Sequence, residues 1–331
     1  MRVTSIPFAG LTLAAAISTA LTGQTPAQPV IAARAKRVIS VAGLNFKDLN
    51  ADGSLQPYED WRLPADARVN DLVHRMTLVE KAGVMLIDTA DVYGPHSNEL
   101  LIRDALHPYP EGLVIATKGG FVRGGRELTA IDAVGNPNYL RQCVYMSARR
   151  LGIDRIDLYY LHSGWAKDAS FEEQVDTLAE LRKEGLIGHI GLSNVTVRQL
   201  RAARQITEIA AVTAYFNVAA RHEAALLDAT VGTGTVFCPW QPVSLTQPGA
   251  ATDTSGPQTI RRVLDSIAAR HGATIPQVTL AWLLARSPAI LPIPATTSIN
   301  HLQENLDAQD LDLIPEDIQS IDSLVPENAA A

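Results

Sequence analysis

Short apolar runs alternate with amphipathic stretches along the chain from about residue 86 to residue 324. The runs predicted to be strands are Val84–Asp88, Leu113–Thr117, Ile156–Leu161, His189–Leu192, Ala211–Tyr215, Thr235–Pro239 and Ile290–Ile293. The stretches with helical periodicity between them include Tyr139–Leu151, Phe171–Glu184, Val197–Ile206 and Thr259–His271. Short buried strands that alternate with helices indicate parallel βαβ units.

Repeated right-handed crossovers of this kind close most simply into an α/β fold, the (β/α)8 TIM-type barrel. The alternative, an open doubly wound sheet, would need a G-x-G-x-x-G turn after its first strand, and the sequence has no such turn. We therefore expect residues 84–325 to form the barrel. Because seven strands are clear, the eighth must come from earlier in the chain. A strand at Arg37–Gly43 and an amphipathic helix at Pro64–Gly83 would supply an atypical or replaced first βα unit.

The N-terminus has the pattern of a secretory signal peptide over residues 1–27. Arg2 gives a positive start, Pro7–Leu21 is an uncharged apolar run, and Ala20 or Ala27 would precede the cleavage site. The run is too short to cross a bilayer comfortably, which takes ~20 apolar residues. An ordinary core segment is the alternative. We expect export to the periplasm or the medium, or a cytoplasmic protein if the signal is not functional.

Composition and charge narrow the choice of partners. The chain is 47% hydrophobic and 19% charged, as in an ordinary globular protein. Its net charge of −7 argues against a nucleic-acid partner, because phosphate binding needs basic clusters. No other segment is predicted to be transmembrane, so no membrane partner is expected after signal removal. Cys143 and Cys238 fit no metal spacing and no disulfide framework, and are predicted to be buried small residues.

The segment D-L-N-A-D-G-S-L-Q-P-Y-E, residues 48–59, matches the template of a calcium-binding loop. Its side-chain ligands would be Asp48, Asn50, Asp52 and Glu59, with Gly53 making the turn. No clear helix precedes the loop, and prolines interrupt the place where an exit helix would begin. We therefore favour a surface turn rich in Asn and Asp, with a calcium site as the alternative.

Four segments end predicted strands, which is where barrel enzymes place their active sites. They are I-D-T-A-D-V-Y-G, A-T-K-G, D-L-Y-Y-L-H and G-L-S-N, and they contain Asp88, Tyr93, Lys118 and His162. Delivery of hydride to a carbonyl leaves a developing alkoxide, which needs a proton donor and positive charge. A tyrosine can donate if a neighbouring ammonium lowers its pKa from ~10. An aspartate can hold that lysine, and a histidine can orient the carbonyl.

These segments agree in order and in content with the signature blocks of the aldo-keto reductases, which the chain resembles from about residue 83 to residue 324. The resemblance implies that Tyr93 is the general acid and that Asp88 and Lys118 tune it. It implies that His162 positions the substrate carbonyl. It also implies hydride exchange between NADP(H), or alternatively NAD(H), and a small aldehyde or alcohol. Within the family, Tyr93–Tyr109 is most similar to the pyridoxal reductase (pyridoxine 4-dehydrogenase) branch, which implies aromatic aldehydes.

The resemblance extends to cofactor binding. Ser193 and Asn194 match the pair that binds the nicotinamide carboxamide, and Trp240 in F-C-P-W-Q-P lies where the family places an aromatic ring against the nicotinamide. The other implied contacts are Thr213, Pro242, Pro294, Ala295, Thr296, Thr297, His301, Glu304 and Asn305. Thr213 replaces the usual glutamine, Ala295 a basic residue or glycine, and His301 an arginine. Preference for NADPH over NADH is therefore open.

The preceding segment, F-K-D-L-N-A-D-G-S-L-Q-P-Y-E-D-W-R-L-P and its continuation, resembles the N-terminal lead of secreted family 3 glycoside hydrolases (β-glucosidases) over about residues 46–86. It includes none of that family's catalytic carboxylates. We therefore expect residues 28–83 to be a hydrolase-like lead fused to the reductase. The alternatives to a reductase are a secreted hydrolase-derived protein that binds carbohydrate or calcium without redox activity, and an inactive fusion that does not fold stably.

Overall fold

The computed structural model describes residues 37–48, 53–63, 86–110, 112–125, 130–246 and 255–325. The chain divides into two compact units, Met1–Val69 and Asn70–Ala331, and we describe each on its own. The predicted signal peptide (residues 1–27) and the predicted helix at Pro64–Gly83 lie outside the described residues.

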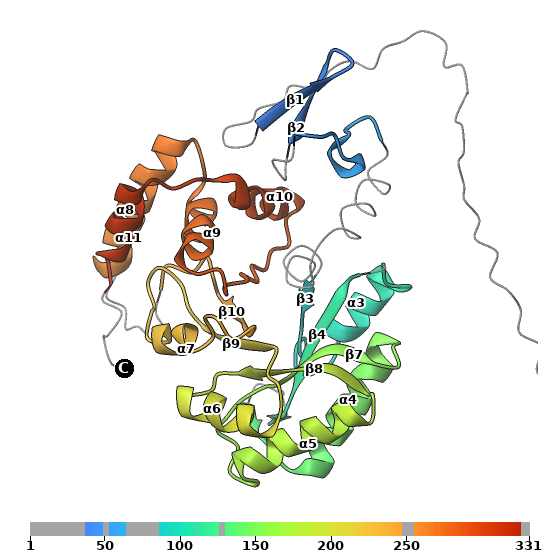
Figure 1. Ribbon diagram of the computed structural model, residues 1–331. Coiled ribbons are helices and arrows are strands. Elements are labelled where there is room, and N and C mark those ends of the chain that lie inside the picture. Colours follow the sequence, from blue (N-terminus) through green and yellow to red (C-terminus); the bar gives the residue numbers. More distant parts are fainter. Residues whose placement is uncertain are drawn as a thin grey trace, which may run out of the picture. The chain divides into compact units, whose positions relative to one another are not determined.

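The elements are numbered in chain order, and Figure 1 labels most of them. The strands are β1 (Arg37–Val41), β2 (Leu44–Asp48), β3 (Leu86–Asp88), β4 (Val114–Gly119), β5 (Phe121–Gly124), β6 (Ala130–Ala133), β7 (Ile156–Leu161), β8 (Ile187–Ser193), β9 (Ala211–Tyr215) and β10 (Val236–Trp240). The α-helices are α3 (Asn98–Leu106), α4 (Pro137–Leu151), α5 (Phe171–Lys183), α6 (Val197–Ile206), α7 (Ala224–Asp228), α8 (Ser255–His271), α9 (Ile275–Arg286), α10 (Ile299–Asp307) and α11 (Pro315–Asp322). Two short 3-10 helices are η1 (Pro57–Glu59) and η2 (Ala308–Asp310). No helix in these ranges is long and apolar enough to cross a bilayer.

In the first unit, β1 and β2 form an antiparallel hairpin. Ala42 and Gly43 close it with φ of 52° and 78°, the positive values that a two-residue type I′ turn requires. The buried ring of Phe46 stacks on Trp61 with 5.6 Å between centroids. The strand predicted at residues 37–43 is therefore present over residues 37–41, but it pairs in a hairpin and not with a parallel neighbour. Supply of the first barrel unit by this lead stays a prediction.

In the second unit, six parallel strands form one sheet in the order β10-β9-β8-β7-β4-β3. Figure 1 shows the sheet curled, with α4, α5 and α6 on its outer side. These strands and their helical crossovers confirm the predicted α/β architecture of the TIM-barrel type. The predicted strand Ile290–Ile293 is present only as a parallel bridge between Ile290 and Phe237. Pro292 and Pro294 explain the difference, since proline has no amide to donate to a neighbouring strand.

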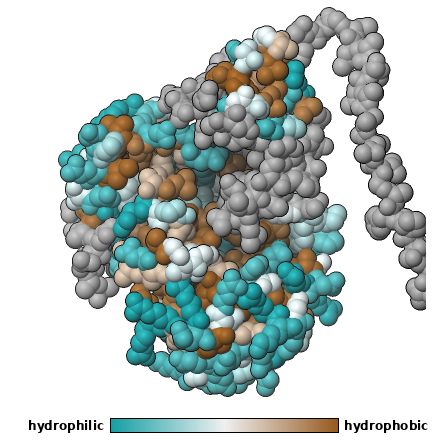
Figure 2. Space-filling model, in the orientation of Figure 1, coloured by the Kyte–Doolittle hydropathy of each residue, from teal (hydrophilic) through white to brown (hydrophobic). Residues whose placement is uncertain are grey.

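The core of this unit lies between the sheet and its helices, and α5 shows why such segments are helical. Ser170 caps α5 by accepting the Glu173 amide at 3.1 Å, and basic residues occupy the last turn. Leu178 and Leu181 on one side of α5 are fully buried in the core. Each buried leucine contributes about 1.5–3 kcal/mol to stability. The outer surface of this part of the molecule is largely hydrophilic (Figure 2).

Candidate active site

The carboxyl ends of three neighbouring strands bring the predicted catalytic side chains together. Asp88 is the last residue of β3, and Lys118 lies one residue before the end of β4. His162 directly follows β7. Because β3, β4 and β7 are parallel neighbours, these ends meet at the same edge of the sheet.

Lys118 is a buried cation held by two oxygen acceptors. It is 3% exposed, its ammonium pairs with the Asp88 carboxylate, and it donates to the Thr89 carbonyl oxygen at 2.9 Å. Burial raises the pKa of Asp88, and attraction to Lys118 opposes this rise. Asp88 Oδ2 has no hydrogen-bond partner among the described residues. A charge buried this deeply persists only when it is paired in this way.

Tyr93 lies in the turn after β3 and remains accessible. Its amide donates to the Ala90 carbonyl oxygen at 3.1 Å, and Arg123 Nε supports the turn by donating to the Val92 carbonyl oxygen at 2.6 Å. Lys118 Nζ lies 5.5 Å from the centroid of the Tyr93 ring, and Tyr93 is 40% exposed. A phenol in this position can protonate a developing alkoxide, because the nearby ammonium stabilises the phenolate left behind.

His162 is 6% exposed, and two aromatic rings lie near its imidazole. Its ring centroid is 6.0 Å from that of Tyr93 and 4.4 Å from that of Phe121. Burial, and to a smaller degree the charge of Lys118, lower the pKa of His162 to about 3. Its Nδ1 has no hydrogen-bond partner in the described part of the chain. The imidazole is therefore neutral near pH 7 and can donate one hydrogen bond to a carbonyl.

Further polar side chains are buried beside this site. The Asp91 amide donates to the Lys118 carbonyl oxygen at 3.0 Å, and burial raises the pKa of the Asp91 carboxyl to about 7, opposed by a hydrogen bond with Cys143. Burial also raises the pKa of Cys143 and of Cys238 to about 12. The Tyr160 hydroxyl donates to Cys238 Sγ at 3.5 Å. Both thiols are buried, as predicted, and stay protonated at neutral pH.

The residues predicted to bind nicotinamide form a hydrogen-bonded group at the ends of β8 and β10. Asn194 Nδ2 donates to Ser193 Oγ at 2.9 Å, and Trp240 Nε1 donates to Asn194 Oδ1 at 3.1 Å. Asn194 has a φ of 53°, and its amide donates to the Thr213 carbonyl oxygen at 2.9 Å. The Thr213 hydroxyl donates to the Cys238 carbonyl oxygen at 2.7 Å. The side chains of Ser193 and Asn194, next to the Trp240 indole, fit the carboxamide and ring of a nicotinamide. The Thr213 hydroxyl is already used in a hydrogen bond to the backbone.

The predicted adenosine-binding block surrounds the N-terminus of α10. Ser298 caps this helix by accepting the His301 amide at 3.4 Å. Ala295, Thr296, Thr297 and His301 are exposed, Pro294, Glu304 and Asn305 are half-buried, and Pro242 is buried. No hydrogen bond between described side chains joins this block to the group around Asn194. Exposed hydroxyls at a helix N-terminus fit a phosphate. Because residues 293–305 include no lysine or arginine, recognition of a 2′-phosphate would depend on His301 and the two threonines.

Comparison with known proteins places this chain in a family. The model of the aldo/keto reductase family matches residues 53–326. The chain belongs to the aldo/keto reductase family. A pyridoxine 4-dehydrogenase of Escherichia coli is 38% identical over 266 residues, which cover 79% of this chain and 88% of the relative. An uncharacterized oxidoreductase of Schizosaccharomyces pombe is 37% identical over 265 residues, which cover 79% and 81%.

Solved structures of aldo-keto reductases are similar to this chain over most of its length. The crystal structure of a thermostable aldo-keto reductase in complex with the inhibitor epalrestat has a TM-score of 0.61 and 27% identity, and the match covers 85% of this chain and 99% of that chain. The structure of an aldo/keto reductase from Klebsiella pneumoniae in complex with NADP and acetate has a TM-score of 0.61 and 25% identity, with coverage of 75% and 84%. This aldo-keto reductase is therefore an oxidoreductase with the barrel fold of its relatives. The family match begins at residue 53, within the hydrolase-like segment, so the hydrolase resemblance gains no support from these comparisons.

Two aromatic residues near His162 were not foreseen from the sequence of this reductase. Phe121 begins β5, and Trp165 lies in the loop after β7. Their ring centroids are 5.9 Å apart, and Trp165 is 55% exposed. The sequence offered one signal, an aromatic residue three positions after His162 in a loop at a strand end. Together the rings form an apolar wall beside the neutral imidazole.

Of the predicted metal ligands, Asp48 and Glu59 are buried in the first unit, at 0% and 4% exposed. Asn50 and Asp52 lie outside the described residues. Within the described ranges, no three His, Cys, Asp or Glu side chains are grouped so as to hold a metal ion.

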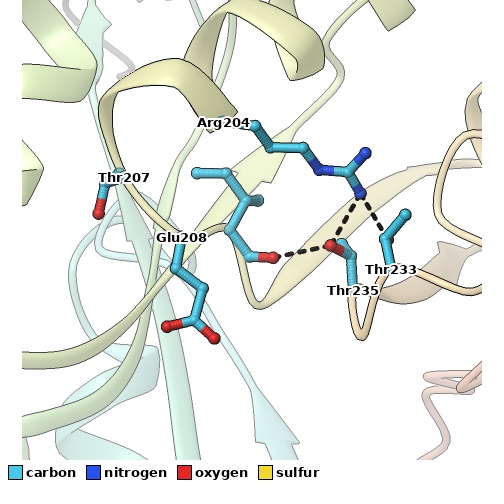
Figure 3. A pocket seen from close by; sticks show the side chains of 6 residues that line it. Arg204, Thr207, Glu208, Thr233 and Thr235 are labelled. Atoms are coloured by element: carbon cyan, nitrogen blue, oxygen red, sulfur yellow. Dashed lines mark hydrogen bonds between the residues drawn. The ribbon is translucent and has the colours of Figure 1, made fainter.

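A cavity of about 210 Å³ lies at the opposite ends of the strands (Figure 3). Its residues Ile209 and Thr235 precede β9 and β10, so it lies away from the sheet edge that carries the predicted catalytic residues. Arg204 donates to Thr233 Oγ1 at 2.7 Å and to Thr235 Oγ1 at 2.9 Å. The guanidinium thus joins the end of α6 to the entry of β10, and we assign it a structural role.

Proposed function

We propose that this aldo-keto reductase transfers hydride between NADP(H) and the carbonyl of a small aldehyde, with Tyr93 as the general acid. The position of Lys118 carries the proposal. Its ammonium is buried, paired with Asp88, and lies 5.5 Å from the ring centroid of the accessible Tyr93. Positive charge fixed at this distance stabilises the phenolate as the proton leaves. His162, neutral because its pKa is about 3, would orient the carbonyl by donating a hydrogen bond.

The nicotinamide half of the cofactor would bind at the carboxyl ends of β8 and β10. NADP(H) supplies the hydride when it is bound. Ser193 and Asn194 would bind its carboxamide, and the Trp240 indole would lie against its nicotinamide. The hydroxyls of Thr296 and Thr297, with His301, would bind the adenosine phosphate. The relative from Klebsiella pneumoniae in complex with NADP supports this choice.

The substrate would be an aromatic, pyridoxal-like aldehyde. The rings of Phe121 and Trp165 offer a flat apolar surface next to His162, and planar substrates gain contact area by packing against aromatic rings. The pyridoxine 4-dehydrogenase relative supports the same substrate class.

Kinetics of the purified chain test the proposal. We expect NADPH oxidation that depends on an aromatic aldehyde, and a lower kcat/KM for an aliphatic aldehyde of similar size. Tyr93→Phe is expected to lower kcat by about 10²–10⁴-fold while NADPH affinity is kept. Tyr145→Phe, in an exposed position on α4, is the matched control. Full activity of Tyr93→Phe would rule out Tyr93 as the acid, and a wild type that neither binds NADPH nor reduces any aldehyde would rule out the function.

Export of the chain is a separate proposal that rests on the apolar run at Pro7–Leu21. The N-terminal sequence of protein recovered from periplasm or medium tests it, and a chain found only in the cytoplasm with Met1 retained would contradict it.

A further inference from the structure

The ring of Tyr160 lies against the buried ammonium of Lys118. Tyr160 is on β7 and Lys118 is on the neighbouring strand β4, where the two residues stand directly opposite each other in the register. Residues opposite each other in a sheet project from the same face, so both side chains lie on one side of it. Lys118 Nζ lies over the Tyr160 ring, 5.4 Å from its centroid, which is within the range of a cation–π interaction.

Two other strands fix the position of this ring. Gly191 on β8 stands opposite Tyr160 on its other side. A Cβ atom placed at Gly191 would lie less than 3.0 Å from three atoms of the Tyr160 ring, so the ring occupies the space that a side chain there would need. The Tyr160 hydroxyl donates to Cys238 Sγ on β10 at 3.5 Å. Because Tyr160 is also fully buried, close packing keeps its ring against the ammonium.

The aromatic contact completes the surroundings of the Lys118 ammonium. Two hydrogen-bond acceptors among the described residues bind it, the Asp88 carboxylate and the Thr89 carbonyl oxygen. Its other close partners are two rings, Tyr93 at 5.5 Å and Tyr160 at 5.4 Å. Burial raises the pKa of Tyr160 well above its usual value, so this phenol stays neutral and its ring offers a negative face to the cation. A desolvated cation gains more from such a face than an exposed one.

We propose that Tyr160 is a positioning residue for the reduction, which keeps the Lys118 ammonium at the distance from Tyr93 that proton donation requires. The inference rests on the proposed function, in which Lys118 stabilises the Tyr93 phenolate. Because Tyr160 is fully buried, it acts through Lys118 and not on the substrate. Leucine at this position would offer the ammonium no negative surface and would leave it room to move. Phenylalanine would keep the ring and remove only the hydrogen bond to Cys238.

Steady-state kinetics of the full chain test this role. Tyr160→Leu is expected to lower kcat by about 10–100-fold, because a displacement of about 1 Å in a catalytic group is enough for such a loss. The Kd for NADPH should stay close to that of the wild type, since the residues proposed to bind nicotinamide are on β8 and β10. Tyr160→Phe should keep most of the wild-type kcat, since the ring remains.

Tyr159→Leu is the matched control. Tyr159 is the adjacent residue on β7 and is equally buried, but it belongs to the hydrophobic core cluster on the opposite face of the sheet. It should lower the free energy of unfolding about as much as Tyr160→Leu does, while kcat is kept. Gly191→Ala displaces the ring without changing Tyr160 and should lower kcat as Tyr160→Leu does. Circular dichroism checks that all variants are folded.

Nuclear magnetic resonance detects the contact without turnover. In protein with isotope-labelled lysine, the Lys118 side-chain signal is identified by its absence in Lys118→Met. An ammonium over an aromatic face is shifted upfield by the ring current, so Tyr160→Leu should remove part of the shift and Tyr160→Phe should keep it.

The outcomes separate this inference from the proposed function. An active wild type that depends on Tyr93, with an unchanged kcat or an unchanged Lys118 signal in Tyr160→Leu, would overturn the inference alone. An equal loss of kcat in Tyr159→Leu would also overturn it, because the effect would then be one of general packing. A wild type that reduces no aldehyde would overturn the proposed function and, with it, this role of Tyr160.

Discussion

Replacement of Asp91 by asparagine is expected to stabilise the protein increasingly as the pH rises. Burial raises the pKa of the Asp91 carboxyl from 3.8 to about 7. A raised pKa means that the folded state binds the proton more tightly than the unfolded state. The stability that this proton contributes is complete below the unfolded pKa and is lost as the pH rises through the folded pKa. Asparagine does not titrate, so the variant does not suffer this loss.

The size of the effect follows from the two pKa values. Ionisation of Asp91 lowers the free energy of unfolding of the wild type, relative to its value at a pH where the carboxyl is protonated in both states. The decrease is about 2 kcal/mol at pH 5 and about 4 kcal/mol at pH 8. Any constant cost of the asparagine, such as a poorer hydrogen bond to Cys143, is the same at both pH values. The variant should therefore gain roughly 2–3 kcal/mol relative to the wild type between pH 5 and pH 8.

Urea unfolding followed by circular dichroism at pH 5 and pH 8 measures this difference. Asp176→Asn, which changes an exposed aspartate on α5, is the control and should give the same small change at both pH values. An Asp91→Asn variant whose free energy of unfolding differs from that of the wild type by the same amount at both pH values would refute the reasoning.

Two further predictions concern buried charge. Arg150→Met should destabilise the chain by about 3–5 kcal/mol in urea unfolding, because it leaves the fully buried Glu99 carboxylate without its 2.6 Å ion pair. Arg141→Met on the same helix, which breaks only partly exposed pairs, should cost less than about 1 kcal/mol, and equal costs for the two variants would contradict the explanation. For His162, the lowered pKa of about 3 predicts no inflection near pH 6.5 in kcat/KM for carbonyl reduction. An inflection there that disappears in His162→Gln would show that this histidine titrates.

The sequence was enough to predict that the candidate catalytic side chains meet at one edge of the sheet, because two regularities combine there. Buried strands alternate with helices, and parallel strands bring their carboxyl ends to one edge. Asp88, Lys118 and His162 each stand at such an end, so their order along the chain predicted their proximity in space. The fixed spacing from Asp88 to Tyr93 likewise placed the phenol in the first turn beyond the strand.

Other parts depend on contacts that no local pattern encodes. The hairpin of Phe121–Gly124 with Ala130–Ala133 interrupts the βα alternation and was not predicted. The strand at residues 37–41 was predicted, but its partner was not, because an apolar run does not specify whether its neighbour is parallel. Asp48 was assigned to a surface turn because its burial depends on how the first unit packs and not on the loop sequence.

The two buried thiols determine how the protein responds to oxidants. The thiolate is the form that reacts with peroxides and disulfides, and Cys143 and Cys238 are both protonated and shielded from solvent. The chain has two cysteines, so no other thiol is available to form a cross-link. Its fold should therefore be equally stable in an oxidising and in a reducing compartment. A chain that carries an export pattern can thus meet either environment without forming a disulfide bond.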